Sequence, residues 1–133
     1  MIIHLIAPKD LSQWPKIWHH CYSIFQTLPY QIKLWNDEDI DNLLIEDDQD
    51  FFGIINQLPL IYKLDYVRYI ILEKFGGAYF DLDVEIINDF IPSLNPNKIY
   101  LAEGHWNCAI SNHIMISPPL EIVWNSVKNK TKQ

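Results

Sequence analysis

Two aspartates separated by one residue, Asp81 and Asp83, are the side chains whose type and spacing suggest chemistry most directly. They lie in residues 78–85, AYFDLDVE. If this segment is a β-strand, side chains alternate between its faces, and the polar face carries Tyr79, Asp81, Asp83 and Glu85. Like charges on one face repel unless a cation lies between them, and carboxylate oxygens are ligands that Mg²⁺ and Mn²⁺ prefer. The segment predicts a divalent-metal site, with a solvated edge strand or a turn as the alternative.

A long helix is predicted immediately before that segment, over residues 60–75. Its apolar residues recur at about 100° per residue: Ile61, Leu64, Val67, Ile71 and Phe75. Arg68 falls within this stripe and Asp65 at its border. An unpaired buried charge is costly, so Arg68 must snorkel to solvent or meet an anion, and Asp65 three residues earlier can pair with it. The helix alone leaves a structural ion pair and an anion-binding role equally open.

The remaining pattern predicts an α/β fold. Further strands are expected at residues 2–7, 31–35, 98–102, 107–111 and 113–117, and further helices at 12–27, with Ser12 as N-cap, and at 120–128. Gly76 and Gly77 are expected to supply the left-handed cap and tight turn between helix and strand. In such sheets ligands bind at the carboxyl ends of strands, where Asp81 and Asp83 lie. The lysine-rich residues 128–132 are expected to fray.

Composition narrows the classes of partner and compartment. The 133 residues suit one domain, and the net charge of −7 argues against nucleic acid or an anionic membrane as partner. No run approaches the roughly 18 apolar residues of a transmembrane segment, and no signal peptide is evident. Cys21 and Cys108 can pair, but two cysteines define no disulfide framework. We expect a cytoplasmic protein.

Two further metal sites are not expected. Residues 37–50 are strongly acidic, and the spacing from Asp37 is similar to the start of an EF-hand loop. However, Asn42 replaces the glycine and Asp48 the glutamate that such a loop needs, so a solvated face with acids at helix N-termini is the better interpretation. His19 and His20 are adjacent and cannot share a helical face.

The residues from Lys63 to Val84 read KxDxxRYxxLxxFGGxYxDxDV. This ordered set resembles the sugar-nucleotide glycosyltransferases with a DXD motif, and more narrowly the group of mannosyltransferases, α-1,4-galactosyltransferases and capsular polysaccharide transferases. The similarity extends over most of the chain. It implies a GT-A fold, a Rossmann-like α/β sheet, here as a single domain over residues 1–133 that is compact or C-terminally shortened. It also implies metal-dependent, retaining transfer from a UDP- or GDP-sugar to a glycan or protein hydroxyl, as in polysaccharide biosynthesis.

The resemblance also assigns roles to residues. Asp83 would bind Mn²⁺ or Mg²⁺ directly, and Asp81 would bind the metal through water and contact the donor's ribose or sugar. Tyr79 would lie near the nucleotide, and Asp65 and Arg68 would hold the donor sugar. Asp81, Asp83 and Arg68 would therefore carry catalysis. A metal and an arginine offset the negative charge of a diphosphate leaving group.

Two departures from the family pattern leave alternatives open. Ala7 stands where the family usually has a tryptophan near the nucleotide base, and the chain ends before a segment that supplies a further metal or phosphate ligand. Whether His105 or His113 substitutes for that ligand is open. One alternative is a catalytically weak sugar-nucleotide-binding or assembly subunit. The other is a haloacid-dehalogenase-type phosphotransferase, in which a threonine or valine would replace Glu85.

Overall fold

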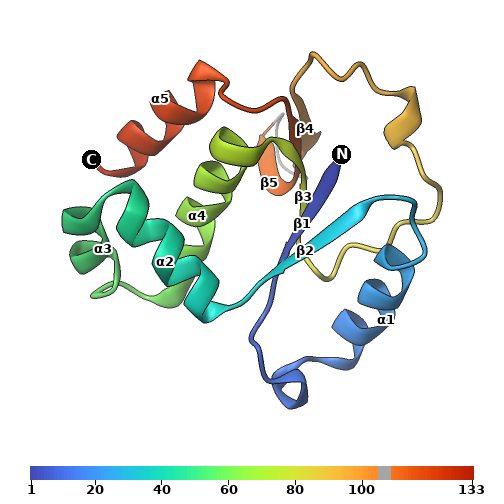
Figure 1. Cartoon of the computed structure of the whole chain (residues 1–133), viewed down its shortest axis with the longest axis horizontal. Helices are drawn as coiled ribbons and strands as arrows, with labels where there is room; N and C mark the ends of the chain where they lie inside the picture. The colour runs from blue at the N-terminus through green and yellow to red at the C-terminus, as the bar shows by residue number, and fades with distance from the viewer. Residues whose placement is uncertain (105–108) are drawn as a thin grey trace.

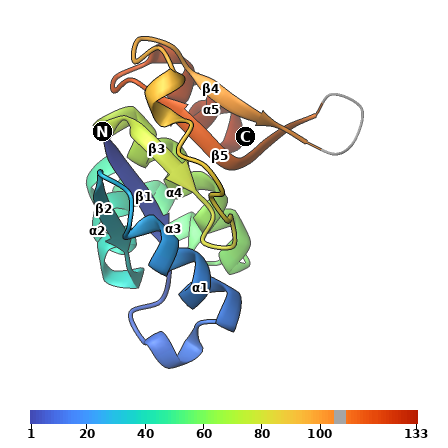
Figure 2. The ribbon, with the colours of Figure 1, turned by 90° about the vertical axis from the view of Figure 1, so that its right-hand side faces the viewer.

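The computed structural model describes residues 1–104 and 109–133 (Figures 1 and 2). Its centre is a five-stranded sheet with the strand order β2-β1-β3-β5-β4. The strands are β1 (Ile2–Ile6), β2 (Gln31–Trp35), β3 (Gly77–Phe80), β4 (Tyr100–Glu103) and β5 (Ile110–Ser117). β1 is parallel to β2 and β3, whereas β5 is antiparallel to β3 and β4. The α/β class is confirmed, and the mixed sheet is consistent with a compact GT-A-like fold.

Helices cover both faces of the sheet (Figure 1). They are α1 (Lys16–Phe25), α2 (Asp37–Asp47), α3 (Gln49–Ile55), α4 (Leu60–Phe75) and α5 (Ile122–Thr131), with short 3₁₀ helices η1 (Leu11–Gln13) and η2 (Ile91–Ser93). Ile3 and Leu5 of β1 pack with Phe25 of α1 on one face. On the other face, Tyr79 of β3 packs with Leu72 of α4. No helix among the described residues is long and apolar enough to span a membrane.

The helix predicted over residues 60–75 is confirmed at both ends, and so is the glycine corner after it. Gly76 and Gly77 have φ angles of 60° and 93°, which side chains other than hydrogen rarely allow. A Cβ atom on Gly77 would also collide with the carbonyl oxygen of Ile2. The glycine pair therefore lets α4 turn directly into the centre of the sheet beside β1.

The buried arc of α4 is wider than the predicted stripe. Ile61 and Phe75 are about half exposed, whereas Tyr66 and Ile70 are fully buried. The helix lies between the sheet and the helices α2 and α5, so it buries side chains in more than one direction. Periodicity identifies one preferred face but cannot count how many neighbours a helix will have.

Several boundaries differ from the prediction. α1 begins at Lys16 rather than near Ser12, because Pro15 holds Trp14 in an extended conformation before the helix. Ser12 lies in η1 and donates its backbone N–H to Asp10. The two short strands expected after residue 106 are one strand, β5, and residues 107–108 lie outside the described part of the chain.

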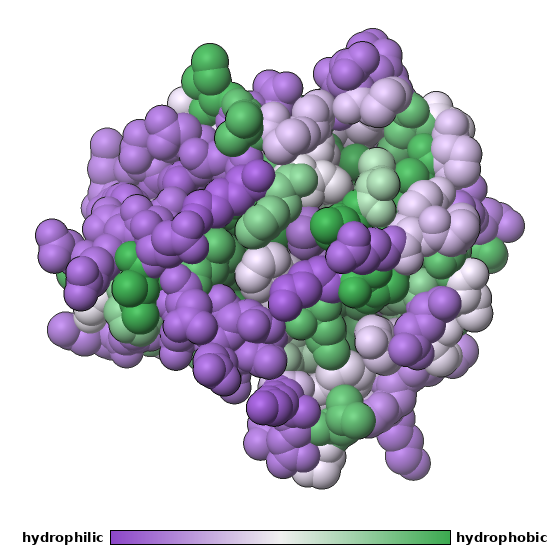
Figure 3. All heavy atoms as spheres, in the orientation of Figure 1, coloured by the Kyte–Doolittle hydropathy of each residue, from purple (hydrophilic) through white to green (hydrophobic). Residues whose placement is uncertain are grey.

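The acidic segment after β2 is helical. α2 begins with a capping box in which Asn36 and Asp39 satisfy each other's backbone N–H groups. Asp37 and Asp41 lie within the same helix, so the segment cannot form an EF-hand loop. Figure 3 shows hydrophilic residues over the part of this face where Figure 1 draws α2, α3 and α5. The expected solvated face is confirmed for most of this surface.

The lysine-rich end is docked rather than frayed. α5 extends to Thr131, and the buried Lys128 forms ion pairs with Asp47 of α2, at 2.8 Å, and Glu73 of α4. Burial alone would lower the pKa of Lys128, but hydrogen bonds to the two carboxylates outweigh burial and raise it. We call Lys128, Asp47 and Glu73 the Lys128 cluster. Lys132 adds a more exposed pair with Asp48.

A buried histidine joins β1 to the glycine corner. His4 Nε2 lies 2.8 Å from the carbonyl oxygen of Gly76, and Trp35 Nε1 donates to His4 Nδ1 at 3.1 Å. These partners require a neutral ring that donates from Nε2 and accepts at Nδ1. Burial, with a smaller contribution from the charge of Lys33, lowers the pKa of His4 to about 4. The ring is therefore a structural link that is neutral at physiological pH.

Candidate functional site

The two aspartates follow the carboxyl end of β3. The strand ends at Phe80, and the backbone N–H of Val84 returns to the carbonyl oxygen of Asp81 in a turn. The prediction of one strand over residues 78–85 is therefore wrong beyond Phe80. β1 pairs with β3 only at Ala78 and Tyr79, so the chain loses its parallel neighbour and turns. The predicted position at the strand's carboxyl end is confirmed.

Because the strand ends before Glu85, this side chain points away from the two aspartates. Its carboxylate lies 3.1 Å from His20 of α1, and it does not line the cleft that Asp81 and Asp83 share. The expectation that Glu85 shares a face with these aspartates is wrong, because the turn after Asp81 breaks the two-residue alternation. The cleft keeps two of the three predicted carboxylates.

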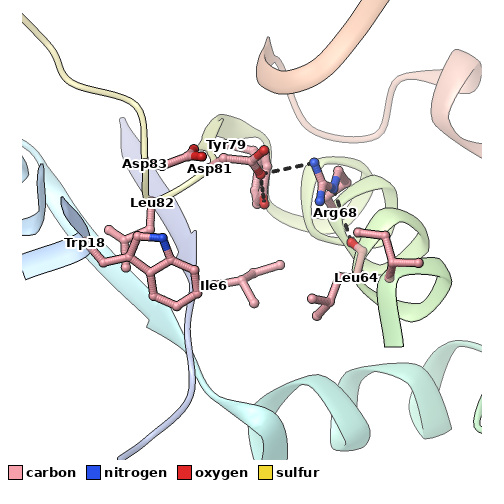
Figure 4. Close-up of a pocket in the computed structure, with 9 residues that line it drawn as sticks. Ile6, Trp18, Leu64, Arg68, Tyr79, Asp81, Leu82 and Asp83 are labelled. Atoms are coloured by element: carbon pink, nitrogen blue, oxygen red, sulfur yellow. Dashed lines mark hydrogen bonds and ion pairs between the residues drawn. The ribbon is translucent and has the colours of Figure 1, made fainter. Parts of the chain in front are cut away.

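Arg68 of α4 connects the aspartate loop to the rest of the fold (Figure 4). Its Nη1 atom lies 3.2 Å from Asp81 Oδ1 and donates to the carbonyl oxygen of Asn112 at 2.9 Å. Its guanidinium carbon lies 4.7 Å from the centre of the Tyr79 ring. A buried arginine with a carboxylate, a carbonyl oxygen and an aromatic face is well satisfied. Of the two alternatives expected for Arg68, snorkelling to solvent or meeting an anion, the structure shows the second.

Tyr79 holds the same oxygen of Asp81 by a second hydrogen bond. Its hydroxyl donates to Asp81 Oδ1 at 2.7 Å. Burial raises the pKa of Tyr79 well above its ordinary value, so the phenol stays protonated and can only donate to the carboxylate. Both described contacts of the Asp81 carboxylate use Oδ1. Its Oδ2 atom can therefore accept a ligand without breaking either contact.

Asp65 lies on the other side of the guanidinium. Its Oδ1 atom is 3.2 Å from Arg68 Nη2 and accepts a hydrogen bond from Asn112 Nδ2, also at 3.2 Å. The predicted pair between Asp65 and Arg68 is confirmed. Asn112 was not singled out in the sequence analysis, because nothing local indicates that β5 brings it to α4, 47 positions from Asp65.

A cleft of about 210 Å³ opens beside these side chains. α4 supplies Arg68 and Leu64, and the end of β3 and its loop supply Asp81 and the exposed Asp83. Figure 4 shows Trp18 of α1 on the opposite side from Leu64 and Arg68. We call this the aspartate cleft. It combines two carboxylates and a buried arginine with an apolar wall.

Trp18 was predicted only as a core residue of α1. In the structure it is half-buried and lines the aspartate cleft. Ala7 is buried in the core and does not line this cleft. The position of Trp18 on the helix that follows β1 is compatible with a place in the cleft wall, but its helical spacing fits the core equally well.

The described residues provide no third metal ligand. No group of three or more His, Cys, Asp or Glu side chains among them is arranged to hold a metal ion. His113 contributes its carbonyl oxygen to the backbone N–H of Asp81, and its ring contacts Ser111. His105, the other candidate for that ligand, and Cys108, the possible disulfide partner of Cys21, lie outside the described residues. Two carboxylates still suit Mg²⁺, which usually keeps several waters and substrate phosphates as its other ligands.

Comparisons with known proteins agree on one family. Residues 12–101 match a protein-family model described as a glycosyltransferase sugar-binding region containing a DXD motif. The chain is 39% identical over 104 residues to inositol phosphoceramide mannosyltransferase 1 of Schizosaccharomyces pombe. This alignment covers 77% of this chain and 33% of that protein. It is also 41% identical over 56 residues to inositol phosphoceramide mannosyltransferase 3 of the same yeast. That alignment covers 41% of this chain and 16% of that protein. The chain thus spans about a third of the length of the first relative.

Proposed function

Because this chain belongs to the glycosyltransferase family whose sugar-binding region contains a DXD motif, we propose that it transfers a sugar from a nucleotide-diphosphate sugar to a hydroxyl acceptor. The observation that carries the proposal is the arrangement of Arg68, Tyr79 and Asp81 at the strand end, beside Asp83 in one cleft. A buried cation that orients a carboxylate next to a second, exposed carboxylate suits a metal-diphosphate ligand.

We propose Mn²⁺ or Mg²⁺ as the cofactor, held by Asp83 directly and by Asp81 through water. Asp81 Oδ2 is the available atom, since Arg68 and Tyr79 hold Oδ1. When bound, the metal would offset the negative charge of the diphosphate leaving group. This arrangement also explains how a chain with a net charge of −7 could bind an anionic donor.

In the proposed reaction the acceptor oxygen forms a bond to the anomeric carbon of the donor sugar. The bond from that carbon to the phosphate oxygen breaks, and its electron pair stays on the diphosphate. The acceptor proton passes to the departing diphosphate or to water. Arg68 keeps Asp81 and Asp65 oriented and places a permanent positive charge beside the leaving group. We propose retention of the anomeric configuration.

Mannose is the first sugar to test. The two similar yeast proteins are named as mannosyltransferases that act on inositol phosphoceramide. We therefore propose GDP-mannose as the first donor candidate, ahead of UDP-glucose and UDP-galactose. The acceptor carries a hydroxyl group, and an inositol-containing lipid is one candidate beside a glycan or a protein.

We propose that Trp18 contacts the donor in place of the ring that the family has at the position of Ala7. The aromatic face lies at the cleft wall opposite α4 (Figure 4), and rings of this size supply large apolar contact area. Trp18→Phe should keep the fold and a weaker donor contact, and Trp18→Leu should weaken donor binding further. Equal donor affinity for both variants and the wild type would contradict this role.

Donor hydrolysis in the absence of acceptor tests the proposed function. Release of nucleoside diphosphate from one of the three donors should require Mn²⁺ or Mg²⁺ and stop with chelator. Metal-dependent binding without hydrolysis, and without transfer to any acceptor, would favour the sugar-nucleotide-binding subunit. The haloacid-dehalogenase-type alternative predicts phosphatase activity instead, and Glu85, which pairs with His20, stands where that chemistry wants a threonine or valine.

A further inference from the structure

The turn between α3 and α4 and the first residues of α4 carry a group of exposed apolar side chains, which we call the apolar patch. Its members are Ile54, Leu58, Leu60, Ile61 and Tyr62, each 48–61% exposed. Single exposed apolar residues are common on protein surfaces, but contiguous groups of them mark surfaces that bind a partner. Figure 1 draws this turn at the lower left margin of the fold.

The patch comes from one compact segment that carries no charge. The backbone N–H of Gln57 donates to the carbonyl oxygen of Ile54, and that of Tyr62 donates to the carbonyl oxygen of Pro59. Residues 51–62 contain no Asp, Glu, Lys, Arg or His, although 20% of the chain is charged. The segment thus presents apolar groups to solvent without a charged side chain among them.

The first residues of α4 show what shape of partner could cover the patch. Leu60, Ile61 and Tyr62 are consecutive, and each is turned by about 100° from the one before it. A partner helix or a groove covers one stripe of a helix, with contacts three and four positions apart. Side chains that point to three sides of a helix end are covered together by a medium that surrounds the end. The surface region of a lipid bilayer is such a medium.

The charges that border the segment are compensated or negative. Lys63 pairs with Asp41 of α2, and Lys132 of the C-terminal end pairs with Asp48. Neither lysine is left free to bind an anionic lipid headgroup. Asp50 immediately precedes the segment and is exposed. The patch is therefore complementary to a lipid surface without net charge, and it should be repelled by an anionic one.

The apolar patch reaches the aspartate cleft. Ile61 belongs to both, since it lines the cleft and is 57% exposed. Leu64 and Arg68 continue the same cleft wall along α4. A lipid surface that covers the patch would therefore lie beside the cleft that contains Asp81 and Asp83.

A second group of exposed apolar side chains provides a contrast. Leu120 and Ile122 are 77% and 81% exposed, but the charged Glu121 lies between them. The backbone N–H of Leu120 donates to the carbonyl oxygen of Glu73, near the end of α4. This group thus lies at the other end of α4 from the apolar patch, and Figure 1 draws the start of α5 at the top. Leu120 and Ile122 are therefore matched controls for exposure alone.

We propose that the apolar patch inserts into the surface of a bilayer of zwitterionic lipids and holds the aspartate cleft next to the lipid headgroups. The net charge of −7 argues against an anionic bilayer, whereas uncharged apolar side chains gain free energy by leaving water. The acceptor hydroxyl is then that of a lipid headgroup. Docking is argued from the patch itself, and the headgroup as acceptor rests on the proposed function.

Flotation of the full chain with phosphatidylcholine vesicles tests the docking. We expect the wild type to float with these vesicles in the absence of any donor. Vesicles that also contain phosphatidylserine should bind the chain more weakly at low salt, because like charges repel. Added salt should reduce this difference, because it screens the repulsion.

Two double variants compare the ends of α4. Leu60→Ser combined with Tyr62→Ser should raise the vesicle concentration for half-maximal binding by about tenfold or more, because apolar groups that leave water are lost. Leu120→Ser combined with Ile122→Ser should leave that concentration unchanged. All four side chains are more than half exposed, so both variants should keep the fold and the wild-type affinity for GDP-mannose with Mn²⁺, measured without vesicles.

The outcomes separate this inference from the proposed function. No flotation of the wild type, an equal loss in both double variants, or tighter binding to the vesicles with phosphatidylserine would each overturn the docking. A wild-type dimer in light scattering that the Leu60→Ser and Tyr62→Ser variant loses would assign the patch to a second copy of the chain and overturn it as well. Vesicle binding at the patch without donor binding would support the docking and count against the proposed sugar transfer. Donor binding without vesicle binding would count against the docking alone.

Discussion

Two cationic side chains, Arg68 and Lys128, are buried to the same extent in different surroundings. Their exposed fractions are 6% and 8%. Each meets two carboxylates from different parts of the chain. Around Lys128, Asp47 is 11% exposed and Glu73 is 24% exposed. The carboxylates of the Lys128 cluster are therefore largely shielded from solvent, although the one lysine offsets only one of their two negative charges.

The surroundings of Arg68 are open. Asp65 and Asp81 are 42% and 35% exposed, and the exposed Asp83 adds a further carboxylate at the cleft. As around Lys128, the carboxylates outnumber the cation, but here the surplus negative charge faces a cavity. The comparison shows which of two similar ion clusters has capacity for a ligand. A closed cluster holds helices together, whereas an open cluster whose surplus charge faces a cavity is suited to bind a cation and the anion that accompanies it.

The largest predicted effect on stability is at the closed cluster. Lys128→Met leaves Asp47 and Glu73 buried without their cation, and the free energy of unfolding should fall by about 3–5 kcal/mol. Urea denaturation measures this loss. Lys130→Met, at an exposed position of the same helix, should change stability by less than about 0.5 kcal/mol. Similar values for both variants would show that α5 is not held by the Lys128 cluster.

His4 is a third buried ionisable group, and unlike Arg68 and Lys128 it should stabilise the fold only while it is neutral. His4 has a pKa of about 4 in the folded chain, against 6.5 for a free histidine. Between these pH values the unfolded chain binds the proton and the folded chain does not. Stability should therefore fall as the pH falls from about 6.5 to about 4, by up to roughly 3 kcal/mol from this residue.

Urea midpoints measured across this pH range test the histidine. His4→Gln should remove most of the dependence, and His19→Gln, at an exposed position, should keep it. An unchanged pH dependence in His4→Gln would mean that other groups cause it. Together with Lys128→Met, this experiment separates a buried group that must stay neutral from one that must stay charged.

Removal of Arg68, the cation of the open cluster, should lower stability less than removal of Lys128 and should abolish donor binding. Arg68→Met leaves Asp65 and Asp81 partly hydrated, so we expect a loss of only about 1–2 kcal/mol. Donor binding should nevertheless be lost. Arg68→Lys keeps the charge but not the fork of donors, and it should recover stability better than donor binding. A loss of stability as large as that of Lys128→Met would contradict the distinction between the clusters.

The sequence alone predicts those features that depend on neighbouring residues in the chain. α4 is long and periodic and is followed by Gly76, so both its limits and the ion pair between Arg68 and Asp65 could be predicted. Asp81 followed from its position at the end of an α/β strand. The residue at which β3 stops could not be predicted, because that depends on where β1 ceases to be its neighbour.

The parts that were missed depend on contacts between distant residues. Lys128 reads as one of several lysines in a terminal tail, and its partner Asp47 lies 81 positions away. Asn112 and Trp18 carry no local pattern that separates a cleft wall from a core.

Calorimetric titration of donors tests the central claim most directly. GDP-mannose, UDP-glucose and UDP-galactose are titrated with Mn²⁺ and with chelator into the wild type, Asp83→Asn and Glu85→Gln. We predict that one donor binds only with metal, that Asp83→Asn weakens it by more than about tenfold, and that Glu85→Gln, whose carboxylate faces His20, leaves it unchanged. Stability should stay within about 0.5 kcal/mol of the wild type in both variants. Absence of donor binding to the wild type, or equal binding to Asp83→Asn, would contradict the assignment of the aspartate cleft as a metal-dependent donor site.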